Sequence, residues 1–302
     1  MPSELLSIAI PTRNRSHLLR DLLKSIAAEL ANSTLTTDDI KIYIFDNAST
    51  DDTRAVAHEI MGGFEHFTYC CNETNIGGVG NILRCAAQPP GQYKWLIGDD
   101  EFVGEGALPY LVAQLRTRQP GWFIHSNGHY APALNPPHTF ADVGDFVRAA
   151  ASGDPMLLIT AGTISLNTFR ADCFDHALAQ SLAKTSSYPQ FFALMNGLRQ
   201  TGAPVFITER ATIIFREQRP APSGGELPLD SDRNWRHCIE WIKNAFDLPN
   251  LDSQILSRTV SRGLLRQMLR HPWKTFRNNA AFLLIPGAYP RILKRIWYMF
   301  KP

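Results

Sequence analysis

The sequence predicts an α/β fold built on a mainly parallel sheet that is flanked by helices. Through the first 118 residues, apolar strand-like runs alternate with segments of helical periodicity. This alternation is typical of βαβ units, whose strands run parallel. Three of the apolar runs stop abruptly at polar residues. Because the carboxyl ends of parallel strands meet at one edge of a sheet, where ligands bind, we expect a binding site at that edge.

The predicted elements follow one another in a regular order in this part of the chain. Strands are predicted at 6–10, 40–45, 67–71 and 93–97, and helices at 16–30, 51–60, 79–87 and 106–118. The first helix is predicted from its apolar spacing, and the second from the acidic residues in its first turn. The following part is less regular, with strands expected at 122–125, 157–160 and 205–208 and a helix at 188–200.

Length and composition place the chain among ordered globular proteins. The 302 residues, with 44% apolar and 19% charged, are enough for one large domain or for a domain with an appendage. The five cysteines are odd in number and show no paired CxxC spacing, which argues against a disulfide framework and favours a reducing cytoplasm. We expect no signal peptide, because the N-terminus lacks a basic region and a long apolar stretch, and no membrane-spanning segment, because no run approaches eighteen apolar residues.

The charges are distributed unevenly along the chain. From Ser253 onward there are ten basic residues and no acidic one, which leaves 20 basic and 28 acidic residues before it. Five of the basic residues recur every four positions, as on one side of a helix: Arg258, Arg262, Arg266, Arg270 and Lys274. Aromatic residues near the end of the chain stand among further basic ones, a pattern that favours an anionic membrane surface over nucleic acid. An amphipathic helix packed on the domain is the alternative interpretation.

The segment with the clearest potential to bind a metal is the turn Gly98-Asp99-Asp100-Glu101, which directly follows a predicted strand. Carboxylate oxygens are the ligands that Mg²⁺ and Mn²⁺ prefer, with phosphate oxygens and water completing the coordination. Taken alone, the turn is equally compatible with an acidic strand end that caps the next helix. The three segments that precede it along the chain favour the metal.

Together these four segments resemble the nucleotide-binding half of a family 2 glycosyltransferase, a family with the GT-A fold. The family's Pro-Thr-x-Asn-Arg loop corresponds to Pro11-Thr12-Arg13-Asn14-Arg15, and its Asp-Asp-x-Ser-x-Asp loop to Asp46-Asn47-Ala48-Ser49-Thr50-Asp51. Its Asn-x-Gly segment corresponds to Asn75-Ile76-Gly77, and its Asp-x-Asp metal motif to Asp99-Asp100-Glu101. The Gly-Asp-Asp-acid variant is similar to abequosyltransferase-like members of the family.

The resemblance implies roles for individual residues. Asp46 would accept hydrogen bonds from the nucleobase, and Asp99 would face ribose or sugar hydroxyls. Asp100, the predicted catalytic residue, and Glu101 would hold Mn²⁺ or Mg²⁺, which stabilises the charge of the departing nucleoside diphosphate. Glu101 stands where the family usually has Asp, and Asn47 where it has a second acid. The full donor-binding set implied is Pro11, Thr12, Arg13, Asn14, Arg15, Asp46, Asn47, Asn75, Gly77 and Asp99.

The catalytic base is harder to predict. Inverting members of the family carry a Glu-Asp pair at the start of a helix roughly ninety residues beyond the metal motif, where it can deprotonate the acceptor hydroxyl. The corresponding residues here, 186–190, include no acid. Asp172 is the predicted base, and Asp154, Asp175 and Glu217 are the alternatives.

Three histidines, His125, His129 and His138, are not expected to form a zinc site. Gly128 and the prolines after it make a helix improbable there, so His125 and His129 are not predicted to share a face. An acceptor-binding role for one of the histidines remains an alternative.

These inferences combine into one expected protein. Residues 1–220 would form the GT-A domain, with the donor half at 1–118 and the acceptor half at 119–220, and residues 221–302 a linker and a membrane-associating helical tail. We expect a cytoplasmic enzyme at the inner face of the membrane that transfers a sugar from a nucleotide-sugar donor to a lipid-linked saccharide, in synthesis of bacterial O-antigen or capsule. The alternatives are a nucleotidyltransferase, although 11–15 lacks its glycine-rich loop, and a non-catalytic scaffold with the same fold.

Overall fold

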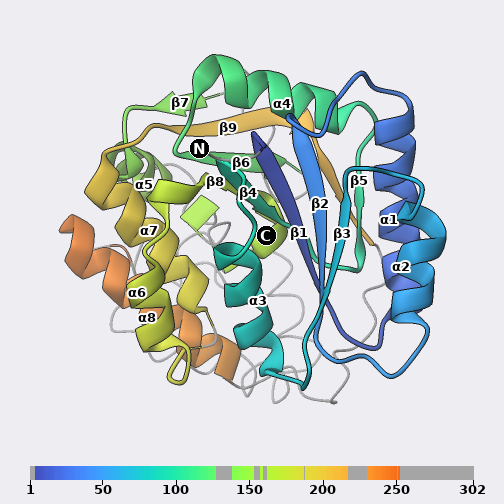
Figure 1. Cartoon of the computed structure of the whole chain (residues 1–302). Coiled ribbons are helices and arrows are strands. Elements are labelled where there is room, and N and C mark those ends of the chain that lie inside the picture. Colours follow the sequence, from blue (N-terminus) through green and yellow to red (C-terminus); the bar gives the residue numbers. More distant parts are fainter. Residues whose placement is uncertain are drawn as a thin grey trace, which may run out of the picture. The chain divides into compact units, whose positions relative to one another are not determined.

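A computed structural model describes residues 4–126, 138–152, 157–158, 162–186, 188–216, 230–249 and 251, with only the backbone described for 230–236 (Figure 1). The chain divides into two compact units, one made of residues 1–146 and 160–219 and the other of residues 147–159 and 220–302. All four motif segments lie in the first unit.

The first unit is built on an eight-stranded mixed sheet. In sheet order, the strands are β3 (Phe67–Cys71), β2 (Ile40–Asp46), β1 (Leu6–Thr12), β4 (Tyr93–Leu96), β8 (Asn167–Arg170), β6 (Trp122–Ser126), β9 (Val205–Ala211) and β7 (His138–Phe140). Strands β1 to β4 pair in parallel, as do β6 and β9, whereas β8 runs antiparallel to β4 and β6, and β7 antiparallel to β9. The predicted mainly parallel sheet is therefore confirmed.

The order of the first four strands determines where a ligand can bind. The chain builds outward from β1 through β2 to β3, and then returns to the other side of β1 with β4 (Figure 1). Such a reversal is a topological switch point, with a crevice at the carboxyl ends of the two strands beside it. Thr12 ends β1, and the acidic turn follows β4 after Ile97. The two polar segments therefore share this crevice.

Four helices connect these strands: α1 (Ser16–Ala31), α2 (Thr53–Met61), α3 (Gly77–Ala87) and α4 (Ala107–Arg118). Each lies within about two residues of its predicted bounds. Because parallel crossovers are right-handed, the reversal after β3 puts α3 on the face of the sheet opposite α1 and α2. There α3 packs on β1, β2 and β4, while α1 packs against α2 and α4. The apolar side of α1, including Leu19, Leu22 and Ile26, is completely buried in the core.

The later part of the first unit completes the sheet and adds two helices. Helices α6 (His176–Leu182) and α7 (Pro189–Thr201) pack against each other, and Pro189 at the first position of α7 lacks an N–H that would have no partner there. Short 3₁₀ helices, η2 (Ile164–Leu166) and η3 (Ala171–Cys173), flank β8. The small strands β5 (Glu101–Val103) and β10 (Ile213–Phe215) form a separate antiparallel pair.

The strand predicted at 157–160 is wrong at its first two residues, since Leu157 and Leu158 form a 3₁₀ turn. Apolar runs this short do not distinguish a strand from another buried segment. Helix α5 (Val143–Ser152) precedes this turn.

In the second unit, helix α8 (Asp230–Phe246) lies within the segment 221–302 that was predicted as linker and helical tail. None of the helices that the structure describes is long and apolar enough to cross a membrane. Residues 217–229 and the whole basic tail from Ser253 lie outside the described residues.

Candidate active site

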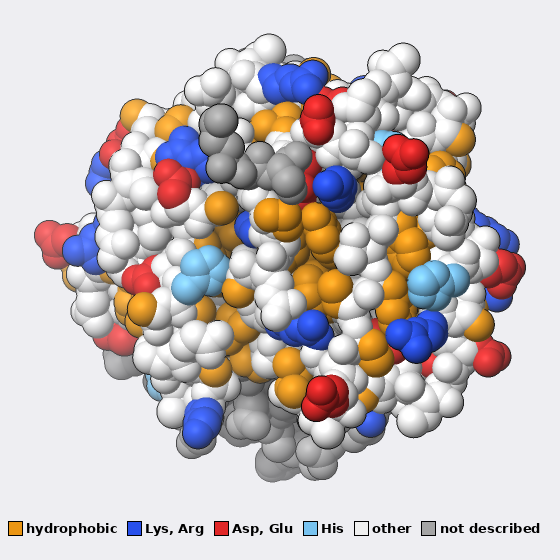
Figure 2. All heavy atoms as spheres, viewed as in Figure 1, with side chains coloured by type: hydrophobic (Ala, Val, Ile, Leu, Met, Phe, Trp, Pro, Cys, Tyr) orange, Lys and Arg blue, Asp and Glu red, His pale blue; other side chains and the backbone are white. Residues whose placement is uncertain are grey.

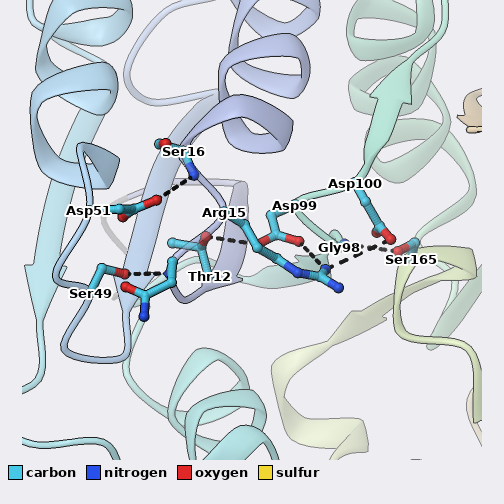
Figure 3. Close-up of polar contacts among 10 residues, drawn as sticks. Thr12, Arg15, Ser16, Ser49, Asp51, Gly98, Asp99, Asp100 and Ser165 are labelled. Carbon is cyan, nitrogen blue, oxygen red and sulfur yellow. Dashed lines mark hydrogen bonds and ion pairs between the residues drawn. The ribbon is translucent and has the colours of Figure 1, made fainter. Parts of the chain in front are cut away.

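The carboxyl ends of β1 and β4 are joined by a buried carboxylate. Thr12 Oγ1 donates a hydrogen bond of 2.7 Å to Asp99 Oδ2, and Arg15 Nη1 donates one of 2.8 Å to Asp99 Oδ1 (Figure 3). Asp99 is only 4% exposed, and burial raises its pKa, although the neighbouring charge of Arg15 and the hydrogen bond from Thr12 act in the opposite direction. Both oxygens of Asp99 are thus hydrogen-bonded within the protein, and these bonds connect the segment after β4 to the end of β1.

Asp100 lies beside the same arginine. Its Oδ2 is 3.8 Å from Arg15 Nη1, and its side chain is 19% exposed (Figure 3). Arg15 therefore uses one nitrogen for both carboxylates. It occupies the N-cap position of α1 without making a side-chain cap, so its side chain is available to the acidic turn.

The acidic turn is anchored to the core through Ser165. Gly98 N donates to Ser165 Oγ at 2.9 Å, and Trp95 Nε1 donates to the Ser165 carbonyl at 2.9 Å (Figure 3 shows Gly98 and Ser165). The Trp95 ring, which is fully buried, stacks on His125 with 4.2 Å between ring centroids. A rigid aromatic stack thus fixes the backbone from which Asp99 and Asp100 project.

The residues around Gly98 fit a divalent cation. A Cβ placed on Gly98 would lie 3.0 Å from Asp100 Oδ1, 3.5 Å from Ser165 Oγ and 3.8 Å from Glu101 Cδ. The two predicted metal carboxyls therefore approach the same side of Gly98, where a side chain on this residue would crowd Asp100. One or two carboxylates, completed by phosphate oxygens and water, are the usual protein share of an Mg²⁺ site. The described residues contain no group of three or more His, Cys, Asp or Glu side chains that could hold a metal.

Glu101 is held more firmly than a turn residue would be. It is the first residue of β5, pairs with Phe215 of β10, and is 3% exposed. The sequence did not predict β5, because three residues are too few to show strand periodicity. Pairing with β10 fixes the backbone of Glu101, so its side chain starts from a defined position beside Asp100.

Asp46 is where the sequence places it, at the end of β2, but its hydrogen bonds are made inside the protein. Oδ1 accepts from Ser49 N and Ser49 Oγ, and Oδ2 accepts from the Tyr69 hydroxyl and, at 3.8 Å, from the Cys71 thiol. A carboxylate has about four lone-pair positions. The expected hydrogen bonds from a nucleobase to Asp46 would therefore have to displace bonds that already exist.

Asn47 is equally engaged and is 3% exposed. Its Nδ2 donates to Asn75 Oδ1 at 2.7 Å and to the Gly77 carbonyl at 3.3 Å, while its Oδ1 accepts from Asn72 Nδ2 and Ile76 N, both at 2.9 Å. An acid could not donate the first two bonds. This explains physically why an amide replaces the family's second acid at this position.

Asn75 and Gly77 are brought to this amide at the start of α3. Asn75 Oδ1 also accepts from Gly77 N at 2.9 Å. Gly77 has φ +80°, a left-handed conformation that glycine adopts without strain. The Asn-x-Gly segment thus forms a fixed corner against β2, beside the exposed side chain of Ile76.

The loops after β1 and β2 are tied to each other. Asn14 Oδ1 accepts from Thr50 N at 2.7 Å, and Asn14 N donates to Ser49 Oγ at 2.9 Å. Ser16 N donates to Asp51 Oδ2 at 3.0 Å (Figure 3). The remaining two residues of the predicted donor set differ in exposure, since Pro11 is half-buried within β1 and Arg13 is exposed. The structure therefore brings the whole predicted donor set to one edge of the sheet.

The structure does not bring Asp172 to this edge. Arg170 pairs with Tyr93, and Ala171 N donates to the Gln92 carbonyl, so Asp172 lies beside the amino end of β4, whereas the acidic turn follows its carboxyl end. Asp172 also receives two hydrogen bonds from Arg170, at 2.7 and 3.1 Å, which lower its pKa. A distant, ion-paired carboxylate is a poor general base, so this placement argues against the Asp172 prediction.

The alternatives to Asp172 give no replacement. Asp175 caps α6 by accepting from Leu178 N at 2.9 Å, and Asp154 and Glu217 lie outside the described residues. At the start of α7 the chain has Gln190, which is 8% exposed and donates a long bond of 3.5 Å to the Gly162 carbonyl. An amide there cannot accept a proton from an acceptor hydroxyl.

His125 proves to be a core residue. It is completely buried, and its Nδ1 and Nε2 lie 2.7 Å from the hydroxyl groups of Thr212 and Thr168, respectively. Burial lowers the pKa of His125 well below the ordinary range. An acceptor-binding role is therefore wrong for His125. His129 lies outside the described residues, and His138 is exposed on β7.

Ser165 and Trp95 were missed as supports of the site. Ser165 stands in an irregular segment with no motif, and it is 67 residues from Gly98 along the chain. Only the antiparallel pairing of β8 with β4 brings the two together.

On the face shown in Figure 2, apolar side chains gather in the middle, with acidic and basic side chains interspersed around them.

Comparison with known proteins identifies the family that the motif segments resemble. Residues 7–138 match the model of glycosyl transferase family 2. The resemblance seen in the sequence is thereby confirmed.

Two curated relatives match about a third of the chain each. Abequosyltransferase RfbV of Salmonella typhimurium is 34% identical over 112 residues, which are 37% of this chain and 32% of that protein. A Campylobacter jejuni GalNAc(5)-diNAcBac-PP-undecaprenol beta-1,3-glucosyltransferase is 30% identical over 108 residues, 35% of this chain and 33% of that protein. The matched segment thus spans about a third of the length of each relative.

Solved structures extend the similarity to nearly the whole chain and confirm the GT-A fold. S. aureus TarS 1–349 in complex with UDP-GlcNAc has a TM-score of 0.59 at 16% identity, over 96% of this chain and 79% of that 1–349 chain. The mannosyltransferase PcManGT of Pyrobaculum calidifontis, in complex with GDP-Man and Mn²⁺, has a TM-score of 0.55 at 13% identity, over 98% and 89% of the two chains. At these identities the likeness concerns the fold alone.

Proposed function

We propose that this protein is a glycosyltransferase that moves a sugar from a nucleotide-sugar donor to a hydroxyl group of a lipid-linked saccharide, in the synthesis of a bacterial surface polysaccharide. The observation that carries the proposal is the convergence of Asp100 and Glu101 beside Gly98, at the switch point of a sheet whose first strands match family 2. A crevice with carboxylates at this place suits a ligand that brings phosphate oxygens and a cation.

The donor class is supported by the solved structures with the same fold, two of which bind UDP-GlcNAc and GDP-Man. In the proposal the donor lies along the carboxyl ends of β1 and β2, over the corner made by Asn75 and Gly77. Because Asp46 and Asn47 are engaged with protein groups, their proposed role is to hold this corner in shape. Exposed groups beside it that could contact the donor include Arg13 and the side chain of Ile76.

Asp100 and Glu101 are the residues that would hold Mn²⁺ or Mg²⁺. When bound, the cation supplies stabilisation for the negative charge that develops on the departing nucleoside diphosphate. Asp99, fixed by Thr12 and Arg15, orients the turn from which Asp100 projects. The proposed share of the protein in catalysis is therefore positioning and charge, and the deprotonation of the acceptor is assigned to none of the described residues.

The relatives and the sequence support the proposed acceptor and the proposed place of action. One relative is named for an undecaprenol-linked saccharide, and the other for transfer of abequose. The basic tail would hold the protein at the inner face of the cytoplasmic membrane, close to a lipid-linked acceptor. Deletion from Ser253 should release the protein from liposomes that contain anionic lipid, and unchanged binding would contradict this part of the proposal.

The central experiment measures hydrolysis of a panel of nucleotide sugars in the presence of Mn²⁺ and identifies the products. Release of a nucleoside diphosphate supports glycosyl transfer, whereas release of pyrophosphate from a nucleoside triphosphate and a sugar phosphate would indicate a nucleotidyltransferase. Asp100→Ala should abolish turnover without changing the melting temperature. Asp38→Ala, which removes an exposed carboxylate at the amino end of β2, is the matched control and should keep full activity. No turnover with any donor would leave the scaffold alternative.

A further inference from the structure

Arg15 is placed so that its charge must affect any cation at the acidic turn. Its Nη1 is 2.8 Å from Asp99 Oδ1 and 3.8 Å from Asp100 Oδ2. Asp100 is one of the two carboxyls beside Gly98, so the guanidinium lies against the group that would bind a cation. Two positive charges within a few ångströms in a half-buried setting repel each other by an amount that decides binding.

The two carboxylates are bound to Arg15 unequally. Asp99 is buried and holds the guanidinium by a short, charge-assisted hydrogen bond, which is the stronger kind. Asp100 is more exposed, and its distance to the same nitrogen is beyond hydrogen-bond length. A cation can therefore take Asp100 from Arg15 while the bond to Asp99 stays intact.

The remaining N–H groups of the Arg15 guanidinium suit an anionic partner. Nε and Nη2 of Arg15 have no partner among the residues that the structure describes, and the side chain is 26% exposed. These N–H groups are donors in a fixed planar arrangement that suits phosphate oxygens. A diphosphate placed between Arg15 and the carboxyls of the turn would supply negative charge to the arginine and to the cation together.

We propose that Arg15 is an internal counter-ion of the acidic turn, which makes binding of the divalent cation weak in the absence of a diphosphate and strong in its presence. The inference rests on the proposed function, because it assumes that Asp100 and Glu101 receive the cation. It adds a positioning residue that sets the order of binding: Arg15 protects the carboxylates until the donor arrives. By linkage, the cation and the diphosphate then strengthen each other's binding by the same factor.

The test is Mn²⁺ binding to the full chain, measured by calorimetry or by electron paramagnetic resonance without nucleotide. Arg15→Gln should bind Mn²⁺ at least tenfold more tightly than the wild type, because a positive charge next to Asp100 is removed. Arg15→Lys keeps the charge and should stay within about threefold of the wild type. Arg20→Gln is the matched control, since Arg20 makes a two-bond pair with Glu59 on the exposed side of α1, at 2.7 and 3.0 Å.

Two further measurements make the outcome specific. Adding Asp100→Asn to Arg15→Gln should remove the gained affinity, which shows that it arises at this turn. Adding inorganic pyrophosphate should increase the Mn²⁺ affinity of the wild-type protein, after correction for the complex in solution, and should do so much less in Arg15→Gln. Unchanged or weaker Mn²⁺ binding by Arg15→Gln, or an equal gain in Arg20→Gln, would overturn the proposal.

The failure of this inference can be told apart from the failure of the proposed function. If the wild type hydrolyses a nucleotide sugar but Arg15→Gln shows no gain in Mn²⁺ affinity, only the counter-ion role is refuted. If Mn²⁺ binds as expected in every variant but no donor is hydrolysed, the turn is a cation site and the glycosyltransferase proposal fails. Melting curves for each variant show whether it is folded, and Arg15→Lys provides a second, less disruptive comparison.

Discussion

Replacing the amide of Asn47 by a carboxylate tests whether this residue holds the site together through its donor groups. Asn47→Asp keeps the size and shape of the side chain and keeps the acceptor for Asn72 and Ile76. It removes the two N–H groups that bond to Asn75 Oδ1 at 2.7 Å and to the Gly77 carbonyl at 3.3 Å. The new carboxylate oxygen would then face Asn75 Oδ1 and the Gly77 carbonyl, both acceptors, at a residue that is 3% exposed.

The magnitude follows from the cost of unsatisfied polar groups. Each buried group that loses its partner costs about 1–3 kcal/mol. Asn75 is exposed and can find water, so we expect the lower part of the range for its oxygen and a total loss of about 3 kcal/mol in the free energy of unfolding. For a domain of this size the melting temperature should fall by roughly 6–12 °C.

Urea denaturation at pH 7 measures the effect, with Gln180→Glu as the control. That substitution makes the same change of amide to acid at an exposed position of α6, and should alter stability by less than about 0.5 kcal/mol. Because acceptors surround the introduced carboxyl, its pKa in the folded protein should lie above the ordinary value. The loss should therefore shrink as the pH falls through that pKa and the group regains a proton to donate. A loss no greater than that of Gln180→Glu, or one that grows at low pH, would refute the reasoning.

Two other predictions concern groups away from the proposed cation site. Burial lowers the pKa of Lys94 to about 8, while the charge of Glu4 opposes this shift. Because the unfolded lysine titrates near 10.5, the unfolded chain binds more protons between these values, and stability due to Lys94 should rise by up to about 3 kcal/mol from pH 8 to pH 10.5. Urea titrations at several pH values should show a smaller rise in Lys94→Met, and parallel curves for the two proteins would contradict the placement. Asp172→Asn should keep kcat within about twofold in the nucleotide-sugar assay, since the carboxylate lies at the wrong end of β4; a loss above tenfold would restore it as a candidate base.

The donor half of the fold could be predicted from the sequence because its signals are local. Each strand from β1 to β4 is a short apolar run with a polar end, and each following helix shows its own periodicity. Parallel pairing through helices leaves few alternative topologies, so four segments in the right order indicate one edge of one sheet. The bounds of β3, Phe67–Cys71, agree with the prediction at both ends.

The acceptor half could not be predicted in the same way because its pairing is not local. Strand β8 has four residues. It is distant from β4 in the sequence, and it lies between β4 and β6 because it pairs antiparallel with both. The position of Asp172 depends on this pairing, so its sequence distance from the acidic turn said nothing about its distance in space. Strands β5 and β10, three residues each, stabilise one another and have no separate signal.

The motifs identify which residues meet, but not which of their atoms remain available. Asp46 has its oxygens directed at Ser49, Tyr69 and Cys71, and Asn47 uses both ends of its amide. Such bonds depend on rotamers and on neighbours that no spacing rule contains. Polar residues at a strand end are therefore weak evidence for direct ligand contact and stronger evidence for a rigid edge.

This distinction narrows the chemistry of the edge to few groups. Most polar side chains at the ends of β1 and β2 bond to one another, so the energy of these bonds is spent on holding the loops in place before a ligand arrives. Asp100 is different, because its only described polar contact is the longer ion pair with Arg15, and Arg15 keeps two nitrogens available. A preorganised frame with one exchangeable ion pair is the arrangement expected where a cation and a phosphate must enter together. The acidic turn is thus better understood as a set of carboxylates that Arg15 partly neutralises, and binding of the donor and its cation would redistribute these charges.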